Sequence, residues 1–359
     1  MPNSVSSTTV MKEDPIQGPV WTGVDFGGPG LQTDFVRVPY SSDKSAYGWI
    51  PVPIICVSNG GGGPTALLTA GTHGDEYEGQ IALRRLIHEL PTTRLEGRVI
   101  ILPALNQPAV KAGRRNSPLD GGNLNRLFPG SLTDGPTAAI AYFVAHVLFP
   151  IVDLVIDLHS GGTSLDYLPM ALAHAGRGPA ESESIRRLLK SFGAPFSAIT
   201  NGSGGGGKST LYAAAEQRGI AAITTELGGG PTLSEVGLSI AEKGIRRVLR
   251  DFGIAPDLGD DPNPTTRFAR SLGPNHTIYA PCDGLFEPLV RPGDKVAKGQ
   301  KAGFVYRTDD MVAKPCVLEF STDGIVAFRR FPTMTETGDA LFGLISETEN
   351  DRPSHASKF

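Results

Sequence analysis

Two spacings of hydrophobic residues alternate through the middle of the chain. Short, continuous apolar runs are typical of buried strands, and they occur at residues 66–70, 98–102, 152–158 and 220–225. Between and after them, apolar residues recur at helical spacing and predict helices at 77–90, 137–149, 179–192, 211–217 and 234–252. Strands that alternate with helices favour a mainly parallel or mixed sheet that is covered on both faces. The pattern therefore predicts an α/β fold.

The segments on either side of this region follow a different pattern. Residues 16–57 contain short β-like runs, and Pro51 and Pro53 predict that the second run is an edge strand or an interrupted one. Short runs with turn signals from 268 to 347 predict a small all-β domain. The expected organisation is a disordered N-terminus (1–15), an α/β domain with an N-terminal β segment (16–260), a C-terminal β domain (265–347) and a tail (348–359).

Composition and charge narrow the class of protein. The chain has 359 residues, of which 40% are hydrophobic, and its formal net charge of −4 offers no general attraction to nucleic acid or anionic membranes. The polar N-terminus lacks a signal-peptide pattern, and no apolar stretch reaches the ~18 residues of a membrane span. Three cysteines without C-x-x-C spacing argue against a disulfide framework. We expect a cytoplasmic protein that binds neither nucleic acid nor membrane.

Three predicted strands end in residues that can bind a metal ion. The first leads into His73 and Glu76, the second into His159, and the third into Glu226. Open α/β sheets place their ligands at the carboxyl ends of strands. If the next helix has begun by His73, the three-residue spacing places His73 and Glu76 on one helical face, where they could hold one metal ion. An isolated H-x-x-E is common by chance, and the alternative is a solvated polar turn.

Taken together, these motifs resemble the succinylglutamate desuccinylase and aspartoacylase family of zinc carboxypeptidase-like enzymes. The matching segments are residues 71–76, 123–126, 157–162 and 225–229. Within that family, residues 45–51, 74–79, 117–120 and 283–290 resemble the N-acetyl-diaminobutyrate deacetylases of ectoine breakdown. The resemblance implies a zinc carboxypeptidase-like mixed sheet flanked by helices, with a smaller C-terminal all-β domain of barrel-sandwich type.

The resemblance also implies a metal centre. One Zn²⁺ per chain is expected, held by His73, Glu76 and His159. Two imidazoles and one carboxylate leave a coordination position open for water, as a catalytic zinc requires. Glu226 then matches the general base that takes the proton of the water and passes it to the leaving amine.

Further roles are implied for a long segment with little periodicity, residues 107–135. Arg115 matches the arginine that stabilises charge on the scissile carbonyl oxygen, although the neighbouring Arg114 is an alternative. Asn125 and Arg126 match the pair that binds the substrate carboxylate, and a guanidinium group suits a carboxylate because it can bind both oxygens.

One departure from the family pattern concerns Asn123. Relatives typically have Asp at this position, where it orients a zinc-bound histidine. An amide oxygen can still accept the imidazole N–H, but it lacks the charge that raises ligand basicity. Metal affinity is therefore weaker, unless Asp75 or Asp157 compensates.

The expected activity is that of a zinc-dependent amidohydrolase that deacetylates an N-acetylated amino acid. N-acetyl-L-2,4-diaminobutyrate is the expected substrate, so the expected partner is a small N-acyl amino acid, and a homo-oligomer is possible on sequence grounds. N-succinylglutamate or N-acetylaspartate is the alternative within the family.

Two motifs suggest other classes of protein. Residues 202–209 satisfy the Walker A pattern of NTPases, but the glycine-rich window makes a chance match easy, and no later strand ends in a Walker B aspartate. A mobile loop near the substrate is the favoured interpretation of this segment. Residues 280–300 resemble the lipoyl and biotinyl carrier fold, but the segment ending at Lys314 lacks the Met-Lys-Met arrangement of the modified lysine.

Overall fold

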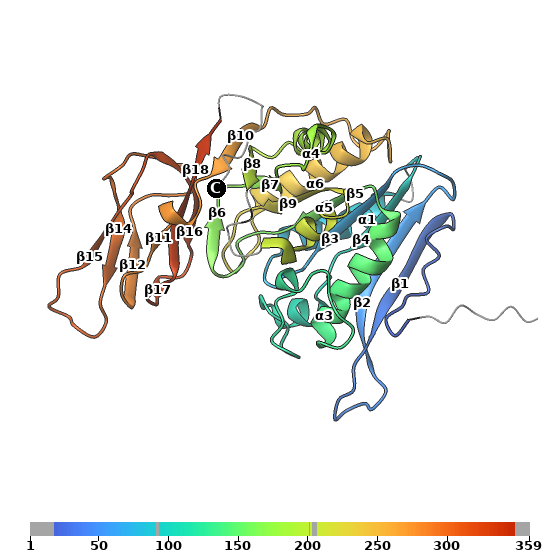
Figure 1. Ribbon diagram of the computed structural model, residues 1–359, viewed down its shortest axis with the longest axis horizontal. Helices are drawn as coiled ribbons and strands as arrows, with labels where there is room; N and C mark the ends of the chain where they lie inside the picture. The colour runs from blue at the N-terminus through green and yellow to red at the C-terminus, as the bar shows by residue number, and fades with distance from the viewer. Residues whose placement is uncertain (1–17, 91–92, 201, 203–206, 349–359) are drawn as a thin grey trace, which may run out of the picture.

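The structure is a computed structural model that describes residues 18–90, 93–200, 202 and 207–348. Within them, helices cover both faces of a large mixed sheet, and a smaller antiparallel sheet lies towards the C-terminal end of the chain (Figure 1). This arrangement confirms the predicted fold class. The predicted disordered N-terminus and all of the predicted tail beyond Thr348 lie outside the described residues.

The large sheet contains fourteen strands in the described part of the chain. In spatial order they are β1 (Gly30–Pro39), β2 (Trp49–Ser58), β4 (Arg98–Leu102), β3 (Thr65–Ala70), β5 (Leu154–Leu158), β9 (Ala221–Glu226), β7 (Met170–His174), β8 (Phe196–Thr200), β10 (Arg267–Ser271), β18 (Ala340–Glu347), β16 (Gly324–Arg330) and β13 (Lys295–Val296), with β11 (Ile278–Tyr279) on β18 and β6 (Leu165–Tyr167) on β16. The strands β4, β3, β5 and β9 are parallel, so the carboxyl ends of β3, β5 and β9 meet at one edge.

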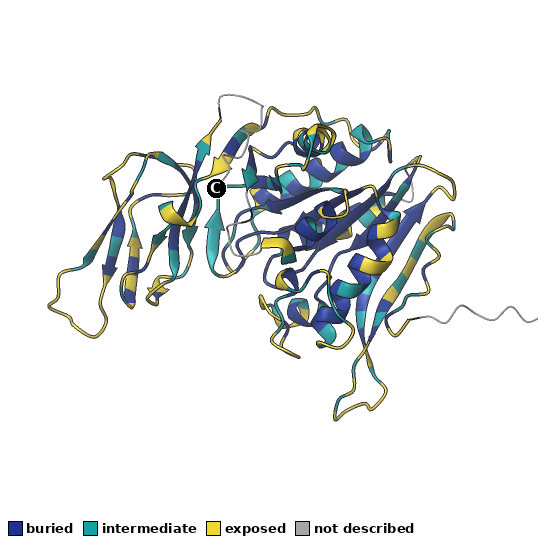
Figure 2. Ribbon diagram, in the orientation of Figure 1, coloured by how far each residue is buried: buried dark blue, intermediate teal, exposed yellow. Residues whose placement is uncertain are grey.

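Two layers of helices cover this sheet. On one face lie α1 (Glu78–Glu89), α4 (Pro179–Phe192) and α6 (Glu235–Asp251), and on the other lie α3 (Pro136–Phe143) and α5 (Leu211–Glu216). Side chains of successive strand residues point to opposite faces. In β3, Leu67 accordingly packs with the α3 and α5 layer and Leu68 with the α1, α4 and α6 layer. The central strands are therefore buried on both sides (Figure 2).

The helices agree with the hydrophobic pattern, with two exceptions. The predicted helix 137–149 is α-helical only as far as Phe143, and it continues as a π-helical turn at Val144–Leu148 and a 3₁₀ turn at Phe149–Ile151. The segment 107–135, predicted to be irregular, begins with the short helix α2 (Gln107–Ala112) and contains a 3₁₀ turn at Leu124–Arg126.

The strand β2 is continuous, so the prediction of an interrupted strand is wrong. Its first half, which contains Pro51 and Pro53, pairs with β1 alone, whereas residues Ile55–Ser58 also pair with β4. A proline cannot donate a backbone hydrogen bond, and it is tolerated where a strand lacks a second neighbour. The edge character predicted for this run therefore holds for its first half only.

The C-terminal part of the chain contributes to both sheets. β10 pairs in parallel with β8, and β18 then pairs with β10, so these strands extend the large sheet. The smaller sheet consists of β15 (Cys316–Glu319), β14 (Lys301–Tyr306), β12 (Gly284–Pro288) and β17 (Met334–Thr335). A separate apolar cluster around Phe286, Phe320 and Phe342 joins it to β18. This part of the chain is therefore anchored to the main sheet through β8.

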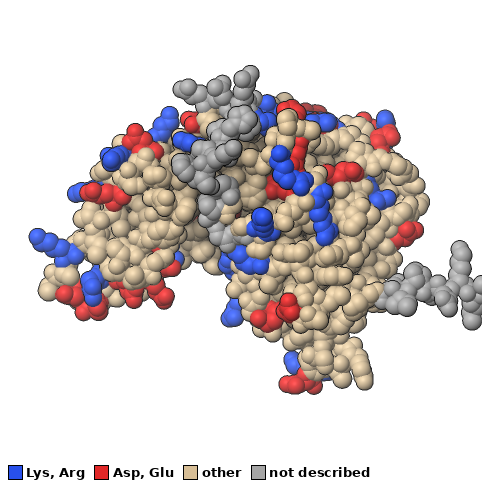
Figure 3. Space-filling model, in the orientation of Figure 1, with Lys and Arg blue, Asp and Glu red and all other residues tan. Residues whose placement is uncertain are grey.

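Charged side chains of both signs are mixed on the face drawn in Figure 3. None of the helices in the described residues is long and apolar enough to cross a membrane.

Candidate active site

The two strand ends at β3 and β5 bring three potential metal ligands together. His73 and Glu76 lie in the turn between β3 and α1, and His159 directly follows β5. The condition that a helix has begun by His73 is not met, because α1 begins at Glu78, close to the predicted start at residue 77. The chain leaves β3 at Gly71, whose φ of +69° is favourable for glycine, and the turn rather than a helical face brings His73 close to Glu76.

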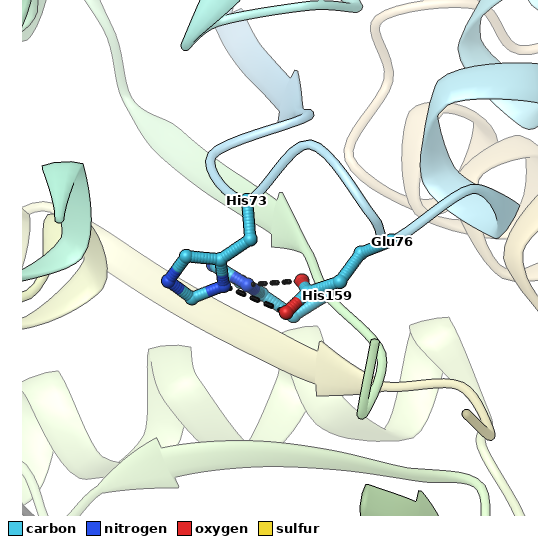
Figure 4. Close-up of side chains that lie close together, drawn as sticks. All are labelled: His73, Glu76 and His159. Atoms are coloured by element: carbon cyan, nitrogen blue, oxygen red, sulfur yellow. Dashed lines mark hydrogen bonds and ion pairs between the residues drawn. The ribbon is translucent and has the colours of Figure 1, made fainter. Parts of the chain in front are cut away.

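The ligand atoms of this cluster converge (Figure 4). His73 Nδ1 lies 2.7 Å from Glu76 Oε1, and His159 Nδ1 lies 2.7 Å from Glu76 Oε2. One ligand atom from each of the three residues lies within 4.8 Å of the other two, and all three residues are buried. The structure therefore brings together the three residues that the sequence indicates as a metal site.

The outer nitrogen of each imidazole ring also has a partner. His73 Nε2 donates to Asn123 Oδ1 at 3.2 Å, and His159 Nε2 donates to Asp157 Oδ2 at 2.8 Å. A proton on Nε2 leaves the lone pair on Nδ1, the atom that faces Glu76. Each ring, when neutral, is thus held in the tautomer that a metal at Nδ1 requires.

Asp157 is itself fixed by hydroxyl groups. It is fully buried, and its Oδ1 accepts hydrogen bonds from Thr69 at 2.7 Å and Thr72 at 3.2 Å. Asp75, the other candidate to compensate for Asn123, instead accepts from the backbone N–H and the hydroxyl of Thr163, both at 2.9 Å. A carboxylate therefore supports His159, whereas His73 has only the neutral amide.

The electrostatic environment shifts the pKa values of the two histidines in opposite directions. Burial lowers the pKa of His73, and the carboxylate of Glu76 does not fully offset it. Burial acts in the same direction on His159, but Asp157 and Glu76 outweigh it and raise the pKa of His159 well above its usual value. For Glu76, burial acts to raise the pKa, and the two imidazoles lower it overall. The site therefore keeps Glu76 ionised, and this carboxylate and the two imidazoles together can stabilise a cation.

This set of donors suits a divalent zinc ion. Imidazole nitrogen and carboxylate oxygen are its ordinary ligands, and three protein ligands are typical of catalytic zinc sites. The fit rests on the convergence of the two Nδ1 atoms and the carboxylate, and on the acceptors that hold the Nε2 atoms.

A cavity of about 610 Å³ opens onto the cluster. Its wall includes the cluster residues and four of the residues singled out from the sequence: Arg115, Asn125, Arg126 and Glu226. Strands β7, β8 and β9 form one side, through residues such as Met170, Ala198 and Thr224, and Ala340 and Leu344 of β18 also line it. The C-terminal part of the chain therefore closes the cavity.

Glu226 lies at the carboxyl end of β9 and carries a perturbed charge. Burial, followed by repulsion from Glu76, raises the pKa of Glu226 well above its usual value. Its Oε2 atom is buried and has no hydrogen-bond partner among the residues that the structure describes. An unpaired carboxylate with a raised pKa, in a cavity beside a cation site, has the properties of a proton acceptor.

The two arginines differ in their surroundings. Arg115 Nη1 lies 3.3 Å from His73 Nδ1 and 3.7 Å from Glu76 Oε1. Arg114 does not line the cavity, and its carbonyl oxygen accepts a hydrogen bond from Gly74. Arg126 lines the cavity and forms no ion pair with a carboxylate in the described residues. A guanidinium group that lines a cavity and has no carboxylate partner among the described residues is suited to an anionic ligand.

The Asn125 side chain makes two contacts besides its predicted role in binding the substrate carboxylate. Its Oδ1 accepts a hydrogen bond from the backbone N–H of Leu211 at 2.9 Å, and its Nδ2 lies 3.4 Å from His159 Nε2. Asn125 therefore links the metal cluster to the start of α5, in addition to lining the cavity.

Sequence reasoning did not single out three residues around the cavity. Tyr167 and Tyr212 line it, and His174, which has no ligand-like sequence context, lies 3.0 Å from the Tyr212 hydroxyl. A sequence pattern that could have indicated Tyr212 is its four-residue spacing from Glu216, which places both residues on one face of α5. His174 comes from a distant strand, and no local pattern indicates it.

The Walker-like segment 202–209 borders the same cavity. Residues 203–206 lie outside the described residues, and Gly202 and Gly207 on either side of them line the cavity. Nucleotide binding by this segment stays untested. The interpretation of a mobile loop near the substrate likewise stays a prediction.

The comparisons with known proteins point to one family. Residues 62–252 match the succinylglutamate desuccinylase/aspartoacylase catalytic domain. The N-alpha-acetyl-L-2,4-diaminobutyric acid deacetylase of Halomonas elongata is 39% identical over 326 residues, which are 90% of this chain and 94% of that protein.

Solved structures agree with this assignment. The product-bound ectoine utilization protein EutE (DoeB) of Ruegeria pomeroyi is 36% identical, with a TM-score of 0.86 over 92% of this chain and 99% of that chain. The succinylglutamate desuccinylase/aspartoacylase of Rhodobacter sphaeroides is 34% identical, with a TM-score of 0.85 over 92% of this chain and all (100%) of that chain. The catalytic-domain match, the shared fold and the identity along nearly the whole chain make this protein a member of the succinylglutamate desuccinylase/aspartoacylase family.

Proposed function

We propose that this chain is a zinc-dependent deacetylase that hydrolyses the amide bond of N-α-acetyl-L-2,4-diaminobutyrate to acetate and the free diamino acid. The observation that carries the proposal is the convergence of His73 Nδ1, His159 Nδ1 and the Glu76 carboxylate at one wall of the cavity. The 39% identity to a deacetylase of that name supports this choice of substrate within the family.

The proposed ligands are prepared for zinc by their neighbours. His73, Glu76 and His159 hold one ion per chain, and Asn123 and Asp157 keep the imidazole protons on Nε2. The chemistry that zinc supplies in such a site is a lowered pKa for water and a polarised amide carbonyl group.

Glu226 manages the proton in the proposed reaction. Its carboxylate takes a proton from the attacking water and delivers it to the nitrogen of the leaving amine. Burial and then repulsion from Glu76 raise the pKa of Glu226, and a cation near Glu76 would offset the repulsion and lower that pKa, so that the carboxylate can accept a proton. The oxygen of water ends in acetate, and the amine leaves with its new proton.

The two arginines divide the anionic groups between them. Arg115, beside His73 and Glu76, stabilises the negative charge that develops on the carbonyl oxygen. Arg126, further along the cavity wall, binds the carboxylate of the amino acid. Asn125 positions Arg126 through the hydrogen bond from Arg126 Nη1 to the Asn125 carbonyl oxygen, at 2.8 Å.

An acetate-release assay over a small panel of substrates tests the proposal. The panel contains the N-α-acetyl and N-γ-acetyl isomers of diaminobutyrate, N-acetylaspartate and N-succinylglutamate. The proposal predicts the highest kcat/KM for the N-α-acetyl isomer. A clear preference for N-succinylglutamate or N-acetylaspartate would assign the chain to the other activities of its family. If no amide is turned over, the proposal that the chain is a hydrolase is rejected.

A further inference from the structure

A chain of three side chains extends outward from the cavity wall. Tyr212 and Glu216 lie four residues apart on α5, and His174 lies at the end of β7. The Tyr212 hydroxyl is 3.0 Å from His174 Nε2, and His174 Nδ1 is 2.7 Å from Glu216 Oε2. Of the three, only Tyr212 lines the cavity.

The side chains of His174 and Glu216 meet at a part of the sheet away from the metal ligands. Met170, at the start of β7, pairs with Glu226 of β9, whereas His174 lies four residues further along the same strand. His174 instead pairs in register with Thr200 of β8, which lines the cavity with the neighbouring Gly202. Tyr212, which lines the cavity, therefore lies beside Thr200 rather than at the metal ligands, and the charge of Glu226 still acts on it.

Glu216 fixes the orientation and the tautomer of His174. Its Oε1 accepts the backbone N–H of His174 at 3.2 Å, and its Oε2 accepts the ring N–H at Nδ1. The carboxylate is buried, with 9% of the residue exposed. In the neutral imidazole the proton then resides on Nδ1, and Nε2 is an acceptor.

The tautomer determines what Tyr212 offers to a ligand. Burial raises the pKa of Tyr212 to about 12, so its hydroxyl keeps its single proton at neutral pH. That proton is donated to His174 Nε2, and the rings lie against each other with centroids 4.6 Å apart. The phenol oxygen then has no further proton to donate, so it accepts hydrogen bonds, from the Thr200 hydroxyl and from a ligand in the cavity.

An acceptor supported by a buried carboxylate suits a positively charged donor. Apart from the metal ligands, the charged residues that line the described part of the cavity are Arg115, Arg126 and Glu226, of which only Glu226, at the reaction centre, is acidic. Burial has the largest effect on the pKa of Tyr212, and the charges of Glu226 and Arg126 also act on it, Glu226 raising the pKa and Arg126 lowering it. A ligand whose carboxylate binds Arg126 can therefore reach Tyr212 with a second polar group.

We propose that Tyr212, oriented by His174 and Glu216, binds the free side-chain ammonium group of the substrate and selects N-acetylated diamino acids over acidic ones. The inference rests on the proposed function, since it names the group that distinguishes substrates within that activity. Tyr212 is the residue that touches the substrate, and His174 and Glu216 are positioning residues. A side-chain carboxylate receives no hydrogen bond from the Tyr212 hydroxyl and is bound less well.

Two substrates that differ only in the amine test the proposal: N-α-acetyl-2,4-diaminobutyrate and N-α-acetyl-2-aminobutyrate. The wild type is expected to show a KM about tenfold or more lower for the diamino compound, as hydrogen bonds to charged groups imply. Tyr212→Phe removes this preference by raising the KM for the diamino compound alone, with kcat within about twofold. Glu216→Gln keeps the shape, removes the charge and reduces the preference in the same direction.

Tyr142→Phe is the matched control. Tyr142 also stacks on a histidine, His146, with ring centroids 4.2 Å apart, but it does not line the cavity. This variant is expected to keep the wild-type preference. A thermal melt of each variant checks that its fold is retained.

Calorimetry with the products adds a readout that needs no turnover. The wild type is expected to bind 2,4-diaminobutyrate more tightly than 2-aminobutyrate, and Tyr212→Phe is expected to bind both equally. Equal losses for both compounds in Tyr212→Phe, or an unchanged preference, would overturn the inference while leaving the deacetylase activity intact. Absence of wild-type turnover would instead reject the proposed function, and the calorimetric preference would still decide the role of Tyr212.

Discussion

At the scale of single residues, the metal ligands and the proton acceptor have separable tasks. His159 contributes an Nδ1 atom to the cluster, whereas Glu226 is a cavity carboxylate outside it. His159→Ala is expected to lose both bound zinc and turnover. Glu226→Gln is expected to retain about one zinc per chain and to lose turnover by a factor of about 10² or more. Metal analysis and acetate release on the same samples check both, and full activity in Glu226→Gln would refute the proton-transfer role.

The partners of the two imidazoles make a second, graded prediction. Asp157→Asn removes the carboxylate behind His159 and is expected to weaken zinc binding about 10- to 100-fold. Asn123→Asp supplies a carboxylate behind His73 and is expected to strengthen zinc binding. Competition with a chromogenic chelator measures both affinities. Asp153→Asn, which alters a carboxylate bonded to the Thr65 backbone rather than to a histidine, is the control.

A pH dependence of zinc binding follows from the raised pKa of His159. In the metal-free protein, Asp157 and Glu76 favour the protonated ring up to a pH above its usual pKa, after burial has acted in the opposite direction. Zinc at Nδ1 must displace that proton, so affinity is expected to fall as pH falls, by up to about tenfold per pH unit below the raised pKa. Chelator competition at several pH values measures the slope, and an affinity that rose towards acid pH would contradict the assignment.

The candidate site was only partly predictable at this scale. His73, Glu76, His159 and Glu226 follow predicted strands, so their convergence could be expected from the topology of a parallel sheet. Their supporting partners could not be expected in the same way. Asp157 lies two residues before His159, but only the fold shows that its carboxylate turns back to that ring. Likewise, His174 meets Tyr212 through tertiary packing that no spacing reports.

At the scale of elements, the position of α1 determines where Glu76 lies. The helix crosses β3 and β5 closely at Gly79, where an added Cβ would overlap the side chain of Leu158 and press on Ala70. Gly79→Ala is expected to destabilise the protein by about 1–3 kcal/mol through overpacking. Denaturant unfolding measures the change, and Gly62→Ala, which has open space around the added Cβ, is the control. Equal stability of the two variants would refute the close-packing argument.

The same scale explains which elements the hydrophobic pattern could predict. Helices such as α4 and α6 carry a long apolar stripe, and their predicted bounds agree with the structure to within a residue. β7 was missed, because it has five residues, two of them alanines, and ends in a histidine. The small helix α2 was also missed, since its six residues are too few to establish a period.

At the scale of the whole molecule, the cavity depends on the C-terminal part of the chain. Residues such as Ala327, Ala340 and Leu344 line it together with the residues of β7, β8 and β9. Because β10 and β18 continue the large sheet, this part of the chain is fixed relative to the metal cluster. The turn signals predicted β structure here, but pairing between β8 and β10 joins distant segments and could not be read from local sequence.

The central claim is that one zinc ion, held by two histidines and a glutamate, is required for deacetylation. Removal of metal with a chelator, followed by titration with zinc, tests it most directly. Acetate release from N-α-acetyl-L-2,4-diaminobutyrate is expected to vanish in the stripped protein and to return in proportion to added zinc, reaching a plateau at about one ion per chain. Undiminished activity in the stripped protein would contradict the account. So would zinc binding in His73→Ala or His159→Ala that is as strong as in the wild type.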